Sequence, residues 1–178
     1  MGKMRGSQNF IILVISLMLG WTLNSVYHVV SSPEQEQSDS HLLYQIAVFQ
    51  IEMLNSAFVD IPNLKATQQL TILKQMAYAV DYTHERFLIS IGENKVAELS
   101  SLKRMMDYIL RLQIGGDRQL KPEEIRIFID ASVLFKQLYE EYAKLMVEDN
   151  DGIVAAVNKK IHKDDLAIYN IFSRKLLQ

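Results

Sequence analysis

Residues 81–85 (DYTHE) are the only local cluster in this sequence that resembles a metal site. Asp81 and His84 are three residues apart, so on a helix they would lie on one face. Di-iron helical bundles use such pairs, but they need them on two helices together with further carboxylates. The sequence has no second Asp/Glu-x-x-His pair. We therefore interpret His84, Glu85 and Arg86 as an exposed, solvated face and predict no metal ligand there.

A second acidic cluster, residues 148–152 (EDNDG), invites comparison with a calcium-binding loop. In an EF-hand loop the invariant glycine is the sixth of twelve residues. With Gly152 in that place, the loop would begin at Val147 and end at Asn158. Neither side chain is the ligand that those positions require. We interpret the cluster as an acidic connection between two helices.

No other pattern predicts catalysis or cofactor binding. The chain has no cysteine, which removes thiol nucleophiles, disulfides and cysteine-based zinc sites. His28, His41 and His162 have no acid and nucleophile at a recognisable spacing. The pair Gly115-Gly116 is followed by no Lys-Ser/Thr, as a phosphate-binding loop would require. We therefore expect a protein that is not an enzyme, with no catalytic residue, cofactor or metal.

The charge balance argues against a nucleic-acid partner. The formal net charge is −2, and the first nine residues carry only Lys3 and Arg5, which leaves −4 for the rest of the chain. Binding to duplex nucleic acid requires clustered Lys and Arg that neutralise phosphates. A mildly acidic domain lacks that property.

Residues 10–30 (FIILVISLMLGWTLNSVYHVV) are apolar enough to anchor the chain in a membrane. As a helix they would span about 30 Å, the thickness of a hydrocarbon core. The competing interpretation is a cleaved signal peptide, but no A-x-A-like cleavage pattern occurs between Thr22 and Ser32. We therefore predict an uncleaved transmembrane signal anchor.

The flanks of this segment predict its orientation. Lys3 and Arg5 precede it, and the positive-inside rule places the short tail, residues 1–9, in the cytoplasm. The bulk of the protein is then extracytoplasmic. The sequence contains no Asn-x-Ser/Thr sequon, which favours a bacterial cell envelope over a secretory pathway.

The rest of the chain predicts an all-α domain. Residues 31–40 (SSPEQEQSDS) are polar and contain a proline, so we interpret them as a linker. Within residues 41–178, every proline and glycine falls at a break between runs of helical periodicity. These breakers are Pro62, Gly92, Gly115, Gly116, Pro122 and Gly152, with Pro122 in a helix-first-turn position. We predict an antiparallel bundle of four to five helices and no sheet.

Apolar residues that alternate at three- and four-residue spacing predict the buried face of each helix. The first three stripes are Leu43, Ala47, Gln50, Leu54 and Ala57; Leu73, Met76, Val80, Thr83 and Phe87; and Leu99, Leu102, Met106 and Ile109. The fourth and clearest stripe is Phe128, Ala131, Phe135, Leu138, Tyr142 and Leu145. Asp60 and Asn63 are expected to cap the second run.

The last run, residues 151–178, has two interpretations. A stripe of Val154, Val157, Ile161, Ile168 and Ile171 would make it one helix. We favour a break or kink at residues 163–165 (KDD), with an aspartate that caps a final helix from Leu166.

The run from His41 to Phe58 is unusually apolar, with Glu52 as its only charged residue. A second membrane span is disfavoured, because two glutamines and an asparagine accompany Glu52 and a carboxylate costs up to ~3 kcal/mol there. This helix is either central to the bundle or covered on one side by another subunit or a partner. We predict that the partner contacts Leu42, Ile46, Phe49 and Met53.

Charge is unevenly distributed along the chain. Residues 34–60 contain five acids and no Lys or Arg, whereas basic residues gather after Gly152. In an up-down bundle the last helix begins near the membrane, so we hypothesise that Lys159, Lys160 and Lys163 contact anionic head groups, each contributing up to ~1 kcal/mol. The alternative is that these lysines form a solvated face or pair with the acidic first helix.

These observations favour a membrane-tethered, non-enzymatic helical interaction module that docks on another membrane or envelope protein, or on itself as a homo-oligomer. The alternative, from a different class, is an extracytoplasmic sensor domain that binds a small ligand and acts through a partner. A cytoplasmic tail of residues 1–9 is too short to carry a signal by itself.

Overall fold

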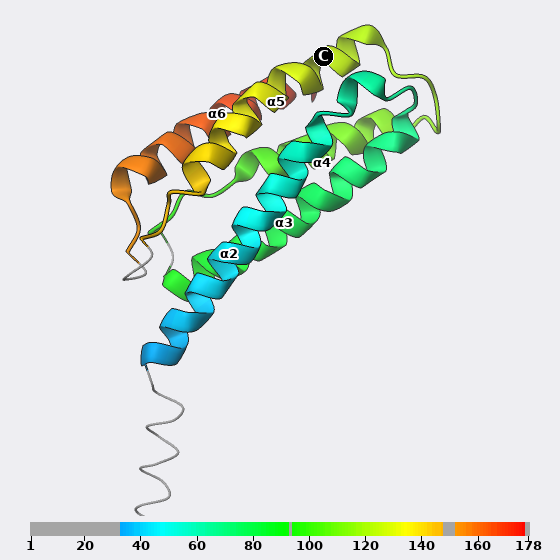
Figure 1. The fold of residues 1–178 in the computed structure, drawn as a ribbon. Coiled ribbons are helices and arrows are strands. Elements are labelled where there is room, and N and C mark those ends of the chain that lie inside the picture. Colours follow the sequence, from blue (N-terminus) through cyan, green and yellow to red (C-terminus); the bar gives the residue numbers. More distant parts are fainter. Residues whose placement is uncertain (1–32, 93, 148–151, 177–178) are drawn as a thin grey trace, which may run out of the picture. The chain divides into compact units, whose positions relative to one another are not determined.

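The computed structural model describes residues 33–92, 94–147 and 152–176 of the chain (Figure 1). Its α-helices are α2 (Pro33–Phe58), α3 (Thr71–Ile91), α4 (Ser100–Gln113), α5 (Pro122–Tyr142) and α6 (Ala155–Leu176). Two 3-10 helices, η1 (Ile61–Asn63) and η2 (Thr67–Leu70), connect α2 to α3. Within the described ranges there is no β-strand, only two isolated β-bridges. The all-α prediction is confirmed, whereas the predicted tail and anchor, residues 1–30, lie outside the described residues.

The chain divides into two compact units, residues 1–37 and residues 38–178. Of the first unit, the structure describes only the start of α2, from Pro33 to Gln37. The packing described below is that of the second unit.

Helix breakers lie where the sequence predicts them. Gly92 ends α3 with a φ of 93°, a left-handed value that favours glycine. Pro122 occupies the first turn of α5. In the same turn the Glu124 carboxylate accepts a hydrogen bond from the backbone N–H of Lys121 at 2.9 Å and two from the Arg118 guanidinium at 2.6 and 2.9 Å. These hydrogen bonds hold the first turn of α5 against the loop that precedes it.

The α3 helix packs on α4, α4 on α6 and α6 on α5, and the core that they enclose also includes buried residues of α2. At its centre lie the rings of Tyr108 (α4), Phe128 (α5) and Phe172 (α6), with centroids 5.6 to 5.7 Å apart. The predicted stripe of α5 is buried along its whole length. Aromatic and aliphatic burial of this kind is the main source of stability in such a bundle.

The bundle is not antiparallel throughout. Successive contacts from α3 to α4 and from α5 to α6 run in opposite directions along the chain, as predicted. The α4 and α6 helices instead run parallel. Their contacts advance together, through the pairs Ala97–Asn158, Ser101–Asp165 and Arg104–Tyr169.

The α2 helix packs against α3 and α5 through aromatic side chains. Tyr44 has its ring centroid 5.8 Å from that of Phe87 (α3) and 5.9 Å from that of Tyr142 (α5). About two helical turns before Tyr142 on α5, Phe135 stacks on Phe58 with the ring centroids 4.8 Å apart. Both halves of α2 in the second unit are thereby fixed to the bundle.

Two helix starts differ from the prediction. Residues 33–40, which we expected to be a linker, are helical, and the helix begins at Pro33, a residue type that suits a first turn. The α3 helix begins at Thr71 rather than directly after Asn63, because η1 and η2 occupy the intervening residues. Asp60 makes no capping hydrogen bond with its side chain.

The predicted break at residues 163–165 is wrong, because α6 continues through them from Ala155 to Leu176. Asp165 does act as a cap, but for another helix. Its buried carboxylate accepts a hydrogen bond from the backbone N–H of Ser101, in the first turn of α4, at 3.0 Å. The aspartate therefore satisfies a free donor of α4 without interrupting its own helix.

We expect Asp165→Ala to lower the free energy of unfolding by about 1–2 kcal/mol, because the Ser101 N–H would lose its buried acceptor. Asp165→Asn should change it by less than about 0.5 kcal/mol, since the amide oxygen keeps the acceptor and burial already raises the pKa of Asp165. Urea unfolding of the full-length chain in detergent, followed by circular dichroism, measures both. Equal losses for the two variants would contradict this capping role.

Candidate functional site

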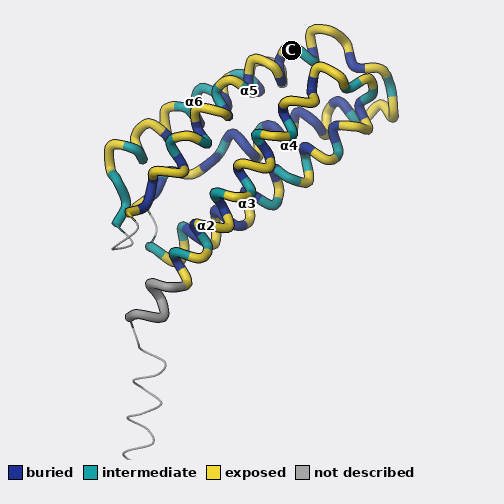
Figure 2. The backbone as a smooth tube through the Cα atoms, viewed as in Figure 1, coloured by how far each residue is buried: buried dark blue, intermediate teal, exposed yellow. Residues whose placement is uncertain are grey.

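The most unusual surface of the second unit is one side of α2. We define the α2 face as Leu42, Ile46, Phe49 and Met53, which are 55, 38, 61 and 43% exposed. The opposite side of the helix carries Tyr44, Ala47, Ile51, Leu54 and Phe58, none more than 7% exposed. Figure 2 shows the buried and exposed residues alternating along α2. This helix therefore has two apolar sides, of which the bundle covers one.

The double-sided pattern explains why α2 is so apolar. Within the segment Asp39–Asn63 an 18-residue window reaches a mean hydropathy of 1.3, so the segment is long and apolar enough to cross a membrane by length and composition alone, a criterion that core helices also meet. In the second unit, one side of this segment packs on α3 and α5. Four of its other apolar residues form the α2 face.

A groove extends the α2 face toward α3. It has a volume of about 300 Å³ and lies where the end of α2, η1, η2 and the start of α3 meet. Its apolar lining includes Met53, Ala57, Leu64, Ile72 and Met76. Met53 therefore belongs both to the α2 face and to the wall of this groove. The two surfaces are continuous, so one bound partner can contact both.

The structure places all four residues of the predicted partner surface on one exposed side of one helix. The interpretation of α2 as a helix enclosed at the centre of the bundle does not hold for the described residues, because this side is open. That a partner covers the α2 face stays a prediction.

His84 is not part of an exposed face, so that interpretation was wrong. The ring is 1% exposed and lies between α3 and α5. Its Nδ1 is 2.9 Å from the hydroxyl of Tyr142, and its Nε2 is 2.9 Å from the carbonyl oxygen of Ala97. The spacing from Val80 through His84 to Phe87 is four and three residues, and that pattern would have predicted burial.

These two contacts assign the protonation of His84. The carbonyl oxygen of Ala97 only accepts, so Nε2 carries the proton and donates it. Nδ1 then accepts a hydrogen bond from the Tyr142 hydroxyl. Burial lowers the pKa of His84 to about 4, so the ring is neutral at physiological pH. Both nitrogens are occupied, and neither is free to bind a metal or to act as a base.

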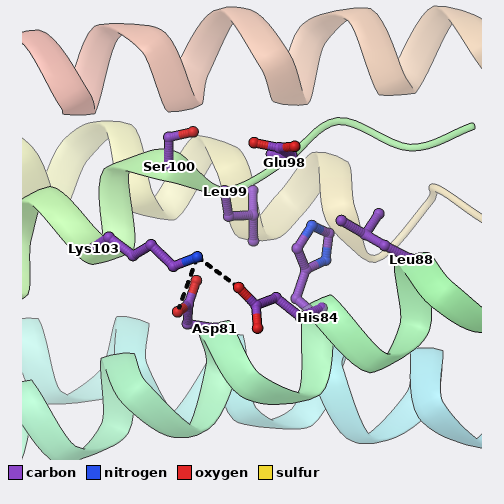
Figure 3. Close-up of a pocket in the computed structure, with 8 residues that line it drawn as sticks. Asp81, His84, Leu88, Glu98, Leu99, Ser100 and Lys103 are labelled. Atoms are coloured by element: carbon purple, nitrogen blue, oxygen red, sulfur yellow. Dashed lines mark hydrogen bonds and ion pairs between the residues drawn. The ribbon is translucent and has the colours of Figure 1, made fainter. Parts of the chain in front are cut away.

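A polar hollow of about 160 Å³ lies beside His84 (Figure 3). Lys103 of α4 points toward the carboxylates of Asp81 and Glu85 on α3, at 3.9 and 2.5 Å. Its ammonium lowers the pKa of Glu85, whereas burial raises the pKa of Asp81. Within the described residues, no group of three or more His, Cys, Asp or Glu is arranged to hold a metal ion. We interpret this cluster as an ion-paired contact between α3 and α4.

The three lysines of the predicted membrane contact lie in the first part of α6. The Nζ of Lys160 is 3.2 Å from the carboxylate of Glu141 on α5, so one of the three is paired, but with α5 rather than with the acidic first helix. Lys159 and Lys163 are exposed. Contact between these lysines and a membrane stays a prediction.

The acidic cluster read against a calcium loop, residues 148–151, lies outside the described residues. The chain on either side of it is held together, because the backbone N–H of Val147 donates to the carbonyl oxygen of Gly152 at 3.0 Å. This agrees with a short connection between α5 and α6.

By its fold, the second unit is an all-α bundle with a row of exposed apolar residues on one side of α2. No protein-family model, no curated protein and no solved structure matches this chain.

The buried His84 predicts a pH-dependent stability. Its folded pKa of about 4 lies below its ordinary value of 6.5, so its contribution is fully present above pH 6.5 and is lost as the pH falls toward 4. The free energy of unfolding should fall by up to roughly 1.4 kcal/mol per pH unit across that window.

Urea unfolding of the full-length chain in detergent at pH 7.5 and pH 5 tests this. His84→Gln should weaken the difference between the two pH values, whereas His162→Gln, an exposed control, should keep it. The same pH difference in the wild type and in His84→Gln would show that His84 does not cause it.

Proposed function

We propose that this protein is a membrane-tethered, non-enzymatic interaction module that docks on another membrane-anchored or envelope protein through the α2 face. The observation that carries the proposal is the exposure of four apolar side chains on one side of α2, opposite a fully packed side. Apolar side chains in such a contiguous row on a folded domain are typical of protein–protein contact sites.

The chemistry of the rest of the second unit supports a binding role. His84 has both ring nitrogens bound within the fold, and Lys103 pairs with the nearby carboxylates Asp81 and Glu85. These groups stabilise the bundle. The predicted anchor at residues 10–30 would hold the α2 face close to a membrane surface, where its partners would be other anchored chains.

The double variant Phe49→Gln and Met53→Gln should lower recovery of the membrane partner about tenfold or more, because each buried apolar contact contributes on the order of 1 kcal/mol. The measurement is crosslinking of the full-length protein in its native membranes, followed by mass spectrometry of the recovered chains. The fold should survive, since both side chains are exposed.

The matched control is Leu110→Gln with Ile114→Gln. These residues are also exposed, apolar and four residues apart, but they lie on and just after α4. Equal recovery from the two double variants would rule out the α2 face as the docking surface.

A second candidate function is a sensor domain that binds a small ligand and acts through a partner. A hollow of about 490 Å³ lies between the start of α4 and α6, within the volume range of small-molecule sites. Val96, Asn158, His162, Leu166 and Tyr169 contribute to its lining. This mixture of apolar and hydrogen-bonding groups suits a small polar molecule.

A ligand in this hollow should raise the melting temperature of the full-length protein in a screen of small metabolites. Leu166→Arg should abolish that rise, because Leu166 is half-exposed at the hollow and the larger side chain would fill it. A screen with no stabilising compound, or a rise that Leu166→Arg leaves unchanged, would count against the sensor function.

A further inference from the structure

The α2 face has the spacing of a coiled-coil seam. In a heptad labelled a to g, residues a and d contact the partner helix, and they are separated by three and four residues. The members of the α2 face are separated by four, three and four residues, so they fall on d, a, d and a. The f positions of the same register are Tyr44, Ile51 and Phe58, all buried in the bundle. Because f lies opposite the seam, α2 points its whole seam away from its own domain.

The positions beside the seam are suited to an identical helix. Gln45 and Glu52 occupy g positions, and Gln50 and Ala57 occupy e positions. In a parallel pair each g residue faces the e residue of the partner's next heptad. Gln45 then faces Gln50, and Glu52 faces Ala57, so the Glu52 carboxylates of two copies do not oppose each other. No Lys or Arg lies between residues 41 and 58 that would select an acidic partner.

The position of the seam in the chain favours a parallel pair. Leu42 lies twelve residues after Val30, the end of the predicted anchor, in every copy. Two copies anchored in one membrane start their seams after the same length of chain, which favours a pair in parallel register. A second copy therefore has a seam with the same residues at the same distance along the chain from its anchor.

We propose that the partner of the α2 face is a second copy of this chain, joined through a parallel two-helix contact in which each seam residue meets its equivalent. This inference rests on the proposed function, because it names the partner of the same surface. The resulting dimer is symmetric, with one two-fold axis along the seam and the two bundles on opposite sides of it.

The contact depends on the membrane for its strength. A seam of four residues covers about three helical turns, which is marginal for isolated helices. The α2 helix is already held by its bundle, so association does not have to order it. Confinement of two anchored chains to one membrane raises their effective concentration. We therefore expect dimers in membranes and dissociation when the protein is diluted in detergent.

The absence of cysteine gives a direct test, because any introduced thiol is the only one in the chain. The variants are Leu42→Cys, Ile46→Cys, Phe49→Cys and Met53→Cys in the full-length protein, oxidised in membranes with copper phenanthroline. All four should give a disulfide-linked dimer, since equivalent seam positions lie close to disulfide distance. The control is Val133→Cys, 58% exposed on α5, and we expect about fivefold less dimer from it.

The pattern of crosslinks separates the outcomes. Dimers at positions 46 and 49 but not at 42 and 53 would show an antiparallel pair and overturn the parallel arrangement. If none of the seam variants forms more dimer than the control does, the proposal that the partner is a second copy is overturned. The proposed function would still stand if the Phe49→Gln, Met53→Gln variant no longer recovered a different membrane protein. If the recovery of every other membrane protein were unchanged in that variant, both the homodimer and the proposed function would be overturned.

A second measurement uses no cysteine variants, so its result does not depend on whether those variants fold. Two copies of the otherwise unaltered chain, carrying different epitope tags, should be recovered together from membranes treated with a lysine-reactive crosslinker. Phe49→Gln with Met53→Gln in both copies should remove that recovery, and Leu110→Gln with Ile114→Gln should not. Recovery that survives the first double variant would contradict the seam as the contact.

Discussion

The packing of the second unit depends on Tyr142, at the end of α5. Its backbone carbonyl accepts a hydrogen bond from the hydroxyl of Tyr44 on α2, and its own hydroxyl donates to His84 on α3. His84 in turn donates to Ala97, in the segment before α4. A buried polar group without a partner costs about 1–3 kcal/mol, so each of these bonds requires the others to stay in place. One connected network thereby joins four parts of the bundle.

This network also determines how α2 is presented. Tyr44 is held by a hydrogen bond to α5 and by ring contacts on both α3 and α5, and Phe58 stacks on Phe135 fourteen residues later along α2. A helix fixed at two points has a defined rotation about its own axis. The α2 face is consequently held in one orientation, which lowers the conformational cost of binding a partner.

Local pattern was sufficient for most of the fold, and distant contacts account for part of what it missed. Periodicity and breakers predicted the helices because both act within a few residues. Asp165 was misread because its partner, Ser101, is 64 residues away in the sequence. The burial of His84 was visible in the local spacing, but its hydrogen bond to Tyr142, 58 residues away, was not. An aspartate beside a lysine is a credible local helix stop until a second helix supplies the free N–H that it caps. The α2 face was predicted because an excess of apolar residues on one helix is visible without its neighbours.

The ionisable groups around His84 form their interactions when the domain folds, whereas the apolar groups of the α2 face stay exposed to water. The histidine with the most perturbed pKa has both nitrogens bound, and the carboxylates nearest to it are paired with Lys103, so their interactions are already realised on folding. The side chains of the α2 face still expose between 38 and 61% of their surface to water. Removing that surface from water is favourable in any partner helix of matching spacing. Under the proposed function, burial of this surface by a partner is the process that it drives.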